Sequence, residues 1–204
     1  MRSMNLSEAG IREGISEVIV TTRSASGQPN AAPIGIITTT TADKDEHFAR
    51  LYEGSRTLYN VLETNTLAAN VTEDAALFVK AAFEKLNAAW LSLFHGFPVL
   101  KEANAWVLFA SSLIEKKRES FLFQLTPLAV NITAKEVKAI NRGRNAVIEA
   151  AILATRSAII KDQGEKGDID RQMEHYAAIV AKCGGRSEKA ALSIIQAQII
   201  QGYT

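Results

Sequence analysis

The sequence predicts a mainly β fold for the first part of the chain and a helical module for the second. Up to about residue 133, short apolar segments alternate with turn residues, a pattern typical of strands. Beyond it, apolar residues recur at helical spacing and glycines are the main interruptions. A chain of 204 residues can form one domain with a sizeable core, or a barrel with an appended helical module. We therefore expect a β domain over residues 1–133 and a helical module, packed on it, over residues 134–204.

The composition is that of an ordinary soluble globular protein. Hydrophobic residues make up 47% of the chain and charged residues 22%, and the formal net charge is +1. A charge so near zero, without a basic stretch that carries aromatics, argues against binding to nucleic acid or to an anionic membrane. No apolar run is long enough to span a membrane, and residues 1–8 lack the apolar core of a signal peptide. We expect a cytoplasmic protein.

The single cysteine and the three histidines give little support to nucleophilic or metal chemistry. Cys183 excludes an internal disulfide and comes just before Gly184-Gly185, at a predicted helix end. The histidines His47, His95 and His175 lie far apart in the sequence, without paired ligand spacing, so we expect no metal site. The sequence also contains neither a Gly-rich phosphate loop nor a nucleophile elbow.

Six strands are expected in the first part, each bounded by turn residues. The second strand breaks the rules for an ordinary strand, because Pro33 removes a ladder donor and Gly35 has no side chain. Such a proline belongs on a sheet edge or at a bulge. Ser26-Gly27 provides the turn that precedes this strand. The strands are predicted at about residues 15–22, 31–40, 46–52, 66–72, 104–113 and 119–131.

Three segments of the first part are predicted outside these strands. Residues 55–63 form a short helix with Ser55 as its N-cap. Residues 74–86 repeat apolar side chains at helical spacing and form a second helix. For residues 88–101 we expect a helix or loop insertion that covers part of the barrel or a dimer surface.

The second part is predicted to be a small antiparallel set of helices. Its first apolar stripe, over residues 134–161, is interrupted by Arg142-Gly143-Arg144, which can split it into two helices. Asp168 is expected to cap the next helix and Gly184-Gly185 to end it. Ser187 is expected to cap the last helix.

The strand that contains Pro33 is the first candidate site. Its alanines add no bulk, Gly35 allows a close approach, and Asn30 has an amide that both donates and accepts. A small, polar strand surface of this kind can support a flat ligand.

The start of the helix at residues 55–63 is the second candidate site. A helix N-terminus has free backbone N–H groups and a partial positive charge, which favour an anion. Ser55 and Thr57 add hydroxyls and Arg56 adds a guanidinium, which are the groups that a phosphate needs. The simpler interpretation is an ordinary Ser-capped surface helix with a solvated arginine, and this stretch alone favours it.

Four short motifs follow one another in the first part. The first strand ends in Thr21-Thr22-Arg23, and the next turn and strand read Gly27-Gln28-Pro29-Asn30-Ala31-Ala32-Pro33-Ile34-Gly35. The helix start reads Ser55-Arg56-Thr57 with Asn60, and a later strand ends in Asn70-Val71-Thr72. In this order and spacing the motifs resemble the FMN-binding split-barrel superfamily of flavin reductases and pyridoxamine-phosphate oxidases. The chain most resembles an uncharacterised, mainly archaeal family with a helical module after the barrel, which Asn141-Arg142-Gly143-Arg144 and Ile148-Glu149-Ala150-Ala151 also fit.

The resemblance implies a split β-barrel with a C-terminal helical module that binds FMN near a homodimer interface. The phosphate would be held by Ser55, Arg56 and Thr57, with Arg23 as a further candidate. Thr22 is a further candidate for cofactor binding, without an assigned part of the ligand. Asn60 or Asn70 would contact ribityl or ring atoms. The strand residues that would run along the isoalloxazine ring are Asn30, Ala31, Ala32, Pro33, Ile34 and Gly35.

The activity implied by the resemblance is that of a flavin-dependent oxidoreductase of the flavin-reductase type. Hydride would come from a reduced nicotinamide or a deazaflavin, and electrons would leave to a small acceptor. No side chain in the motifs is an obvious acid or base, so no catalytic residue is assigned. Two alternatives stay open: a non-catalytic flavin-binding protein for storage, sensing or electron relay, and a structural protein with an empty cofactor site.

Overall fold

The computed structural model describes residues 6–41, 44–84, 87–134, 141–157 and 163–201. Within these ranges the chain divides into two compact units. The barrel unit comprises the described residues of 1–73 and 85–136, and the helical unit comprises those of 74–84 and 137–204.

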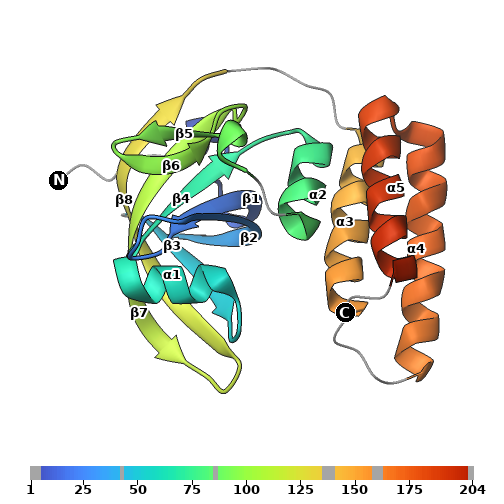
Figure 1. The fold of residues 1–204 in the computed structure, drawn as a ribbon, viewed down its shortest axis with the longest axis horizontal. Coiled ribbons are helices and arrows are strands. Elements are labelled where there is room, and N and C mark those ends of the chain that lie inside the picture. Colours follow the sequence, from blue (N-terminus) through green and yellow to red (C-terminus); the bar gives the residue numbers. More distant parts are fainter. Residues whose placement is uncertain (1–5, 42–43, 85–86, 135–140, 158–162, 202–204) are drawn as a thin grey trace. The chain divides into compact units, whose positions relative to one another are not determined.

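The barrel unit is a closed antiparallel barrel with the strand order β1-β2-β3-β8-β7-β4 (Figure 1). Each strand predicted from the sequence is confirmed, with small shifts at its ends. In chain order the barrel strands are β1 (Gly14–Arg23), β2 (Pro29–Thr40), β3 (Asp45–Tyr52), β4 (Thr66–Val71), β7 (Ala105–Lys116) and β8 (Ser120–Ile132).

Residues 88–101 form a β-hairpin, so the expected helix or loop insertion was wrong. A short 3₁₀ turn, η2 (Ala88–Trp90), leads into β5 (Leu91–Phe94) and β6 (Phe97–Leu100), which pair with each other. The connecting residues His95 and Gly96 have φ angles of 49° and 72°, as the two central residues of a tight hairpin turn require. Histidine is an unusual choice for such a position, and the proline at 98 argues against a strand, so the local signals for this hairpin are weak.

Two short helices contribute buried side chains to the barrel core. The 3₁₀ helix η1 (Ser7–Ala9) and the chain around it add Leu6, Ala9 and Ile11. The helix α1 (Arg56–Thr64), which the sequence predicted, adds Leu58 and Val61. Because α1 is anchored by this inner face, its first turn is held in a fixed place at the barrel surface.

The helical unit contains α2 (Ala75–Phe83), α3 (Arg142–Ser157), α4 (Gln163–Cys183) and α5 (Arg186–Gln201). The predicted helix at residues 74–86 is thus confirmed, and its residues Ala75 and Val79 share a core with the other three helices. Successive helices from α3 to α5 run antiparallel (Figure 1). None of the described helices combines the length and apolar character needed to cross a membrane.

Two predicted helix caps were wrong. Asp168 lies inside α4, where it pairs with Arg171 one turn later. Ser187 is the second residue of α5, and the cap there is formed by the Glu188 carboxylate, which accepts a hydrogen bond from Gly185 N at 2.8 Å. Glu188 is the third residue of the helix, and a glutamate at this position commonly reaches back to the backbone N–H of the N-cap residue.

Gly143 and Gly184 let two helix ends meet backbone to backbone. A Cβ atom at Gly143 would stand 2.5 Å from Gly184 Cα, so no side chain fits there. α3 begins at Arg142, inside the predicted interruption, and α4 ends at Cys183 beside Gly184-Gly185, as predicted. The parts of the predicted apolar stripe at residues 135–140 and 158–161 lie outside the described residues.

Candidate functional site

β2 has an open edge over residues 29–35. These residues pair with β1, whereas the pairing between β2 and β3 begins only at Ile36. In the described part of the chain no other strand pairs with this edge. The backbone N–H and C=O groups that face it are therefore available to a ligand. Proline is tolerated in a strand that has one unpaired side, because its missing N–H is then not needed by a neighbouring strand. Pro33 therefore lies on a sheet edge, as the sequence predicted.

The side chains of β2 alternate between the barrel interior and its outer face. Ile34 packs against the barrel core, and Asn30 points the same way, to α1. Ala31, Pro33 and Gly35 have the opposite parity and lie on the outer face, where all three are half-buried. We call these three residues the β2 strip. It offers a wall of small side chains next to the open edge.

The first turn of α1 lies beside the start of β2. Asn30 Nδ2 donates a hydrogen bond to Thr57 Oγ1 at 3.1 Å, and Asn60 Nδ2 donates one to Thr22 Oγ1 at 2.9 Å. These two bonds tie α1 to both strands of the β1–β2 hairpin. Two motifs that the sequence singled out separately, the strand at Asn30 and the helix start at Thr57, are thereby brought together.

Ser55 is the N-cap of α1, as predicted. Its Oγ accepts a hydrogen bond from Leu58 N at 3.2 Å and donates one to Tyr52 O at 2.8 Å. The hydroxyl proton is therefore used within the protein, and Ser55 contributes to the site by fixing the direction of the helix start.

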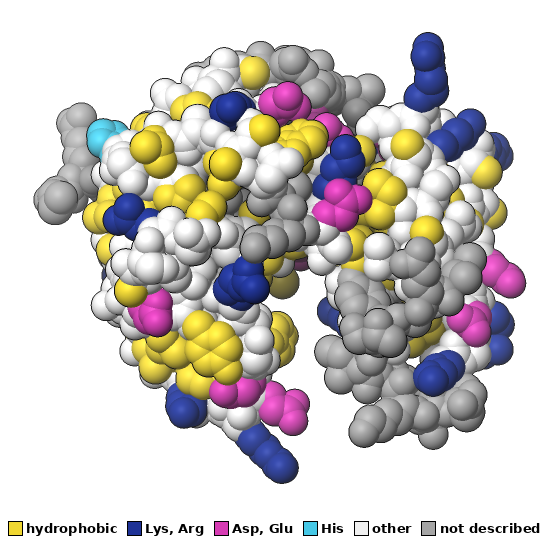
Figure 2. Space-filling view, in the orientation of Figure 1, with side chains coloured by type: hydrophobic (Ala, Val, Ile, Leu, Met, Phe, Trp, Pro, Cys, Tyr) yellow, Lys and Arg dark blue, Asp and Glu magenta, His cyan; other side chains and the backbone are white. Residues whose placement is uncertain are grey.

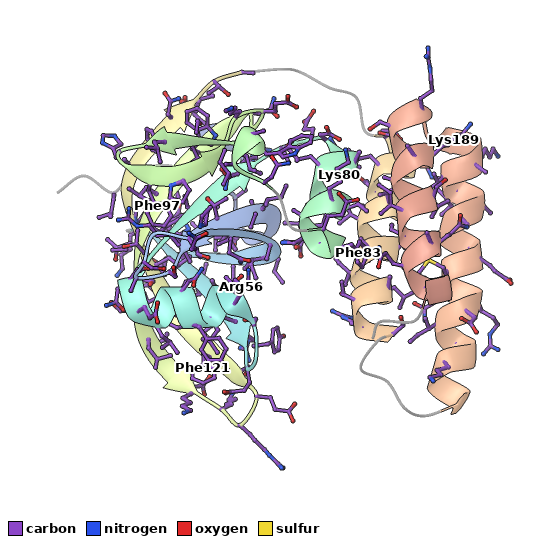
Figure 3. All side chains as sticks on the ribbon, viewed as in Figure 1. Arg56, Lys80, Phe83, Phe97, Phe121 and Lys189 are labelled. Carbon is purple, nitrogen blue, oxygen red and sulfur yellow. The ribbon has the colours of Figure 1, made fainter. Side chains whose placement is uncertain are left out.

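Arg56 is exposed at the first turn of α1 (Figure 3). The backbone N–H groups of Arg56 and Thr57 make no hydrogen bond to any other described residue. Unpaired N–H groups at a helix start attract an anion, and the guanidinium adds a permanent positive charge. The electrostatics of this turn thus match the predicted anion site.

Thr22, Asn60 and Asn70 are held inside the barrel unit. Thr22 and Asn70 are 0% exposed and Asn60 is 4% exposed. Asn70 Nδ2 donates to Ile19 O at 2.8 Å, and its Oδ1 accepts from Leu100 N at 2.7 Å. Asn70 thus joins strands of the barrel unit, and Thr22 Oγ1 accepts the hydrogen bond from Asn60 of α1. The ligand contacts expected of Thr22 and Asn70 stay predictions.

Arg23 is directed to the β5–β6 hairpin. Its Nη1 donates to Gly96 O at 3.1 Å, and its guanidinium carbon lies 5.2 Å from the centroid of the Phe97 ring. A hydrogen bond and a cation–π contact therefore hold this side chain to the hairpin turn. In this structure the partners of Arg23 belong to the hairpin, and not to the start of α1.

Two residues that border the β2 strip were missed from the sequence. Glu17 lies directly opposite Gly35 in the pairing of β1 with β2. A Cβ atom at Gly35 would lie 2.8 Å from Ile15 Cγ2 and 3.3 Å from Glu17 Oε1. The sequence contained enough information to place Glu17 here, because counting residues outward from the Ser26-Gly27 turn pairs residue 17 with residue 35.

His47 is a buried residue of the barrel interior. It is 3% exposed, its Nδ1 lies 3.0 Å from Thr38 Oγ1, and its ring meets Phe109 edge-on with the centroids 6.0 Å apart. Burial lowers the pKa of His47, and the nearby Asp45 carboxylate offsets part of that effect. His47 is thus a neutral packing residue, and in the described part of the chain no group of His, Cys, Asp and Glu side chains is arranged to hold a metal ion.

Comparison with known proteins relates both parts of the chain to one family. The model for the N-terminal domain of "Protein of unknown function (DUF447)" matches residues 16–134, and a second DUF447 model matches residues 141–197. The crystal structure of the FMN-bound DUF447 protein MM1853 from Methanosarcina mazei is similar over 95% of this chain and 99% of that chain. The two share 39% sequence identity, with a TM-score of 0.85.

Two more distant structures share the barrel fold alone. An FMN-binding protein from Thermus thermophilus with bound p-hydroxybenzaldehyde matches with 17% identity over 58% of this chain and 71% of that chain, at a TM-score of 0.50. A flavin reductase domain protein from Arthrobacter sp. FB24 matches with 12% identity over 63% of this chain and 84% of that chain, at a TM-score of 0.51. The predicted split β-barrel with C-terminal helices is therefore confirmed. The chain belongs to the DUF447 family.

Proposed function

We propose that this chain is an FMN-binding flavoprotein, with FMN held between the open edge of β2 and the first turn of α1. The observation that carries the proposal is the hydrogen bond from Asn30 Nδ2 to Thr57 Oγ1, because it keeps these two features together. FMN needs a flat wall, hydrogen bonds at its ring edge and an anion site. The FMN bound to the related Methanosarcina mazei protein supports the proposal.

The first turn of α1 fits the phosphate. The guanidinium of Arg56 and the backbone N–H groups of Arg56 and Thr57 are the donors that would hold it. A hydrogen bond to a charged group contributes about 1.5–3 kcal/mol, so Arg56 would supply a large share of the affinity for the phosphate. Ser55 would support the site from behind, by capping the helix.

The β2 strip and its open edge fit the isoalloxazine ring. Ala31, Pro33 and Gly35 would form the wall, and the free backbone groups of residues 29–35 would bind the ring edge. Ala31 and Pro33 would form most of this wall, because over Gly35 the side chains of Ile15 and Glu17 already come within 2.8 and 3.3 Å of where a Cβ atom would stand. Asn30, Ala32 and Ile34 would support this wall from the barrel interior.

We further propose that the protein is an oxidoreductase of the flavin-reductase type. When bound, FMN would supply hydride and electron transfer, with a reduced nicotinamide or a deazaflavin as donor. The residues named above would bind and orient the cofactor and keep water from the covered face of its ring. No acid or base is assigned, because the side chains of the β2 strip carry no titratable group.

We also propose that the protein forms a homodimer through its barrel unit. Figure 2 shows hydrophobic side chains at the surface of this unit, among charged ones. Exposed apolar side chains that gather on a surface often mark an interface. A dimer would have twice the chain mass of 22.2 kDa by light scattering, and a mass of 22.2 kDa would contradict this proposal. The most exposed large hydrophobic residues of the unit are Ile15, Tyr52, Tyr59, Leu93, Ile114 and Leu128.

An absorption spectrum of the purified protein tests the proposed function. We expect a yellow protein with a flavin spectrum, or uptake of added FMN by colourless protein. Rapid anaerobic bleaching by NADH, NADPH or a reduced deazaflavin would support the oxidoreductase. Stable colour with every donor would favour a non-catalytic flavin-binding role. Protein that stays colourless and takes up no added FMN would overturn the proposal. The remaining alternative would then be a structural protein with an empty cofactor site.

A further inference from the structure

The β5–β6 hairpin lies on the outer face of β1 and stands beside the β2 strip. Thr21 Oγ1 donates a hydrogen bond to Pro98 O at 2.6 Å, and Leu100 N donates one to Asn70 Oδ1 at 2.7 Å. These bonds fix β6 on β1 and β4. Because Thr21 lies opposite Ala31 in the pairing of β1 with β2, the hairpin forms a wall along the β1 side of the strip.

Arg23 is held at the turn of this hairpin. It lies on the same face of β1 as Thr21, opposite Pro29. Its Nη1 donates to Gly96 O at 3.1 Å, and its guanidinium carbon lies 5.2 Å from the centroid of the Phe97 ring. The Phe97 side chain is 2% exposed and belongs to an apolar cluster between the hairpin and the barrel (Figure 3). The guanidinium thus rests on a fixed surface, although Arg23 is an exposed residue.

The charge of Arg23 has no acidic partner among the described residues. Its contacts there are a carbonyl oxygen and an aromatic ring, neither of which carries a full charge. The bond to Gly96 O uses one N–H group and leaves the others of the guanidinium fork to a ligand. An exposed arginine usually loses conformational freedom when it binds an anion. Because this side chain is already held, an anion would bind it at a smaller entropic cost.

Arg23 and Arg56 lie on two sides of the start of β2. The side chain of Asn30 points to the barrel interior and binds Thr57, so the first turn of α1 lies on that side. The Arg23 side chain lies on the outer face, with its partners in the hairpin. A phosphate held at α1 would therefore leave Arg23 to a second anion next to the strip. The donors named for the proposed function are such anions, because a nicotinamide dinucleotide carries a pyrophosphate and a phosphorylated deazaflavin carries a phosphate.

We infer that Arg23 is a substrate-binding residue, which binds a phosphate of the electron donor on the hairpin side of the β2 strip. The inference rests on the proposed function and names a residue for the donor that this function needs. The donor gives up a hydride, which the flavin takes up, and Arg23 keeps its proton throughout. Its part is to bind the donor and to orient it toward the strip.

The test measures donor binding by FMN-loaded protein. NAD⁺, NADP⁺ and an oxidised phosphorylated deazaflavin are unreactive probes for calorimetry. Anaerobic stopped-flow bleaching by the reduced forms separates the dissociation constant of the donor from the limiting rate. Arg23→Gln removes the charge, Arg23→Lys keeps it without the planar fork, and Arg118→Gln is the matched control, because Arg118 is an exposed arginine in the turn between β7 and β8.

For Arg23→Gln we expect the dissociation constant of the donor to rise about 10-fold or more, because a charge-assisted contact is lost. The limiting rate and the affinity for FMN should stay near the wild-type values. Arg23→Lys should lie between Arg23→Gln and the wild type, and Arg118→Gln should bind every probe like the wild type. A loss for NADP⁺ alone would identify the 2′-phosphate, a loss for both dinucleotides the pyrophosphate, and a loss for the deazaflavin alone its phosphate; each supports the inference.

Three results would overturn the inference and leave FMN binding intact. They are unchanged constants for every probe in Arg23→Gln, an equal rise in Arg118→Gln, and weaker binding of FMN but not of riboflavin, since Arg23 would then hold the phosphate of the cofactor. If Arg23→Gln does not fold, probe binding by wild-type protein is compared at low and high salt. Screening should weaken it, and unchanged binding would overturn the inference.

The wild-type protein separates this inference from the proposed function. FMN-loaded protein that binds no donor would overturn the oxidoreductase and the inference, and FMN binding would stand. Protein that takes up no FMN would overturn the proposed function itself, and the inference with it.

Discussion

Replacing Asn70 by alanine should destabilise the barrel strongly, although the residue lies outside the proposed ligand contacts. Asn70 is 0% exposed and joins three strands. Its Nδ2 donates to Ile19 O at 2.8 Å and to Thr21 Oγ1 at 3.0 Å, and its Oδ1 accepts from Leu100 N at 2.7 Å. The substitution Asn70→Ala removes all of these hydrogen bonds at once.

The size of the effect follows from the partners that are left behind. A buried N–H group without an acceptor, as Leu100 N would become, costs about 1–3 kcal/mol. Each of the two lost hydrogen bonds from Nδ2 adds about 0.5–1.5 kcal/mol. Asn70→Ala should therefore lower the free energy of unfolding by about 2–6 kcal/mol. Asn70→Asp should be at least as harmful near pH 7, because a carboxylate cannot donate to Ile19 O.

Urea unfolding followed by tryptophan fluorescence measures this loss. Both tryptophans belong to the barrel unit, and Trp106 Nε1 donates to Leu100 O at 2.7 Å, next to the perturbed site. Asn131→Ala is the control, since this exposed residue of β8 should change stability by no more than about 0.5 kcal/mol. A loss below about 1 kcal/mol for Asn70→Ala would show that Asn70 is not the link between these strands.

Two further predictions concern the helical unit and the barrel interior. Gly143→Ala should lower the free energy of unfolding of the helical unit by about 1–3 kcal/mol, because its Cβ would meet the backbone of Gly184; urea unfolding followed by far-UV circular dichroism measures this loss. Gly167→Ala should be neutral or stabilising, because a Cβ atom there would meet only Arg171 Nη1, at 3.9 Å. Equal effects of the two substitutions would contradict the contact between Gly143 and Gly184. Burial lowers the pKa of His47 from 6.5 in the folded protein. Below about pH 6.5 the unfolded chain therefore binds more protons than the folded one, and the free energy of unfolding should fall as the pH drops below that value. The urea midpoint should decrease from pH 8 to pH 5.5, and by less in His47→Gln; an identical decrease in both proteins would show that another group is responsible.

Much of the barrel could be predicted because its signals are local. The apolar run in β1, the alternation in β8, the serine cap of α1 and the turn at Ser26-Gly27 each depend on residues close in sequence. The β5–β6 hairpin was missed because its turn uses His95, and its fixed position on the barrel depends on long-range bonds such as that from Arg23 to Gly96 O.

The motifs of the candidate site could be predicted from the sequence, whereas the contacts of their side chains could not. Asn30 and Arg56 could be singled out from residue type and spacing, and the bond between Asn30 and Thr57 brings the two motifs together. Burial could not be read in the same way. Thr22 and Asn70 are polar residues in a motif, and only the folded barrel shows that their hydrogen bonds are made within the protein. Glu17 was overlooked because its place beside the β2 strip comes from its strand partner, Gly35.

The most direct test of the central claim compares the affinities of FMN and riboflavin, which lacks the phosphate, for wild-type protein, Arg56→Ala and Arg118→Ala. Arg118 is an exposed arginine in the turn between β7 and β8 and serves as the matched control. If the first turn of α1 binds the phosphate, Arg56→Ala should lose about 10–100-fold in affinity for FMN and little for riboflavin, because one charge-assisted contact of about 1.5–3 kcal/mol is removed. Arg118→Ala should bind both ligands like the wild type. Equal FMN affinity in Arg56→Ala and wild-type protein would show that the first turn of α1 does not bind the phosphate, and no FMN binding at all would contradict the proposed function.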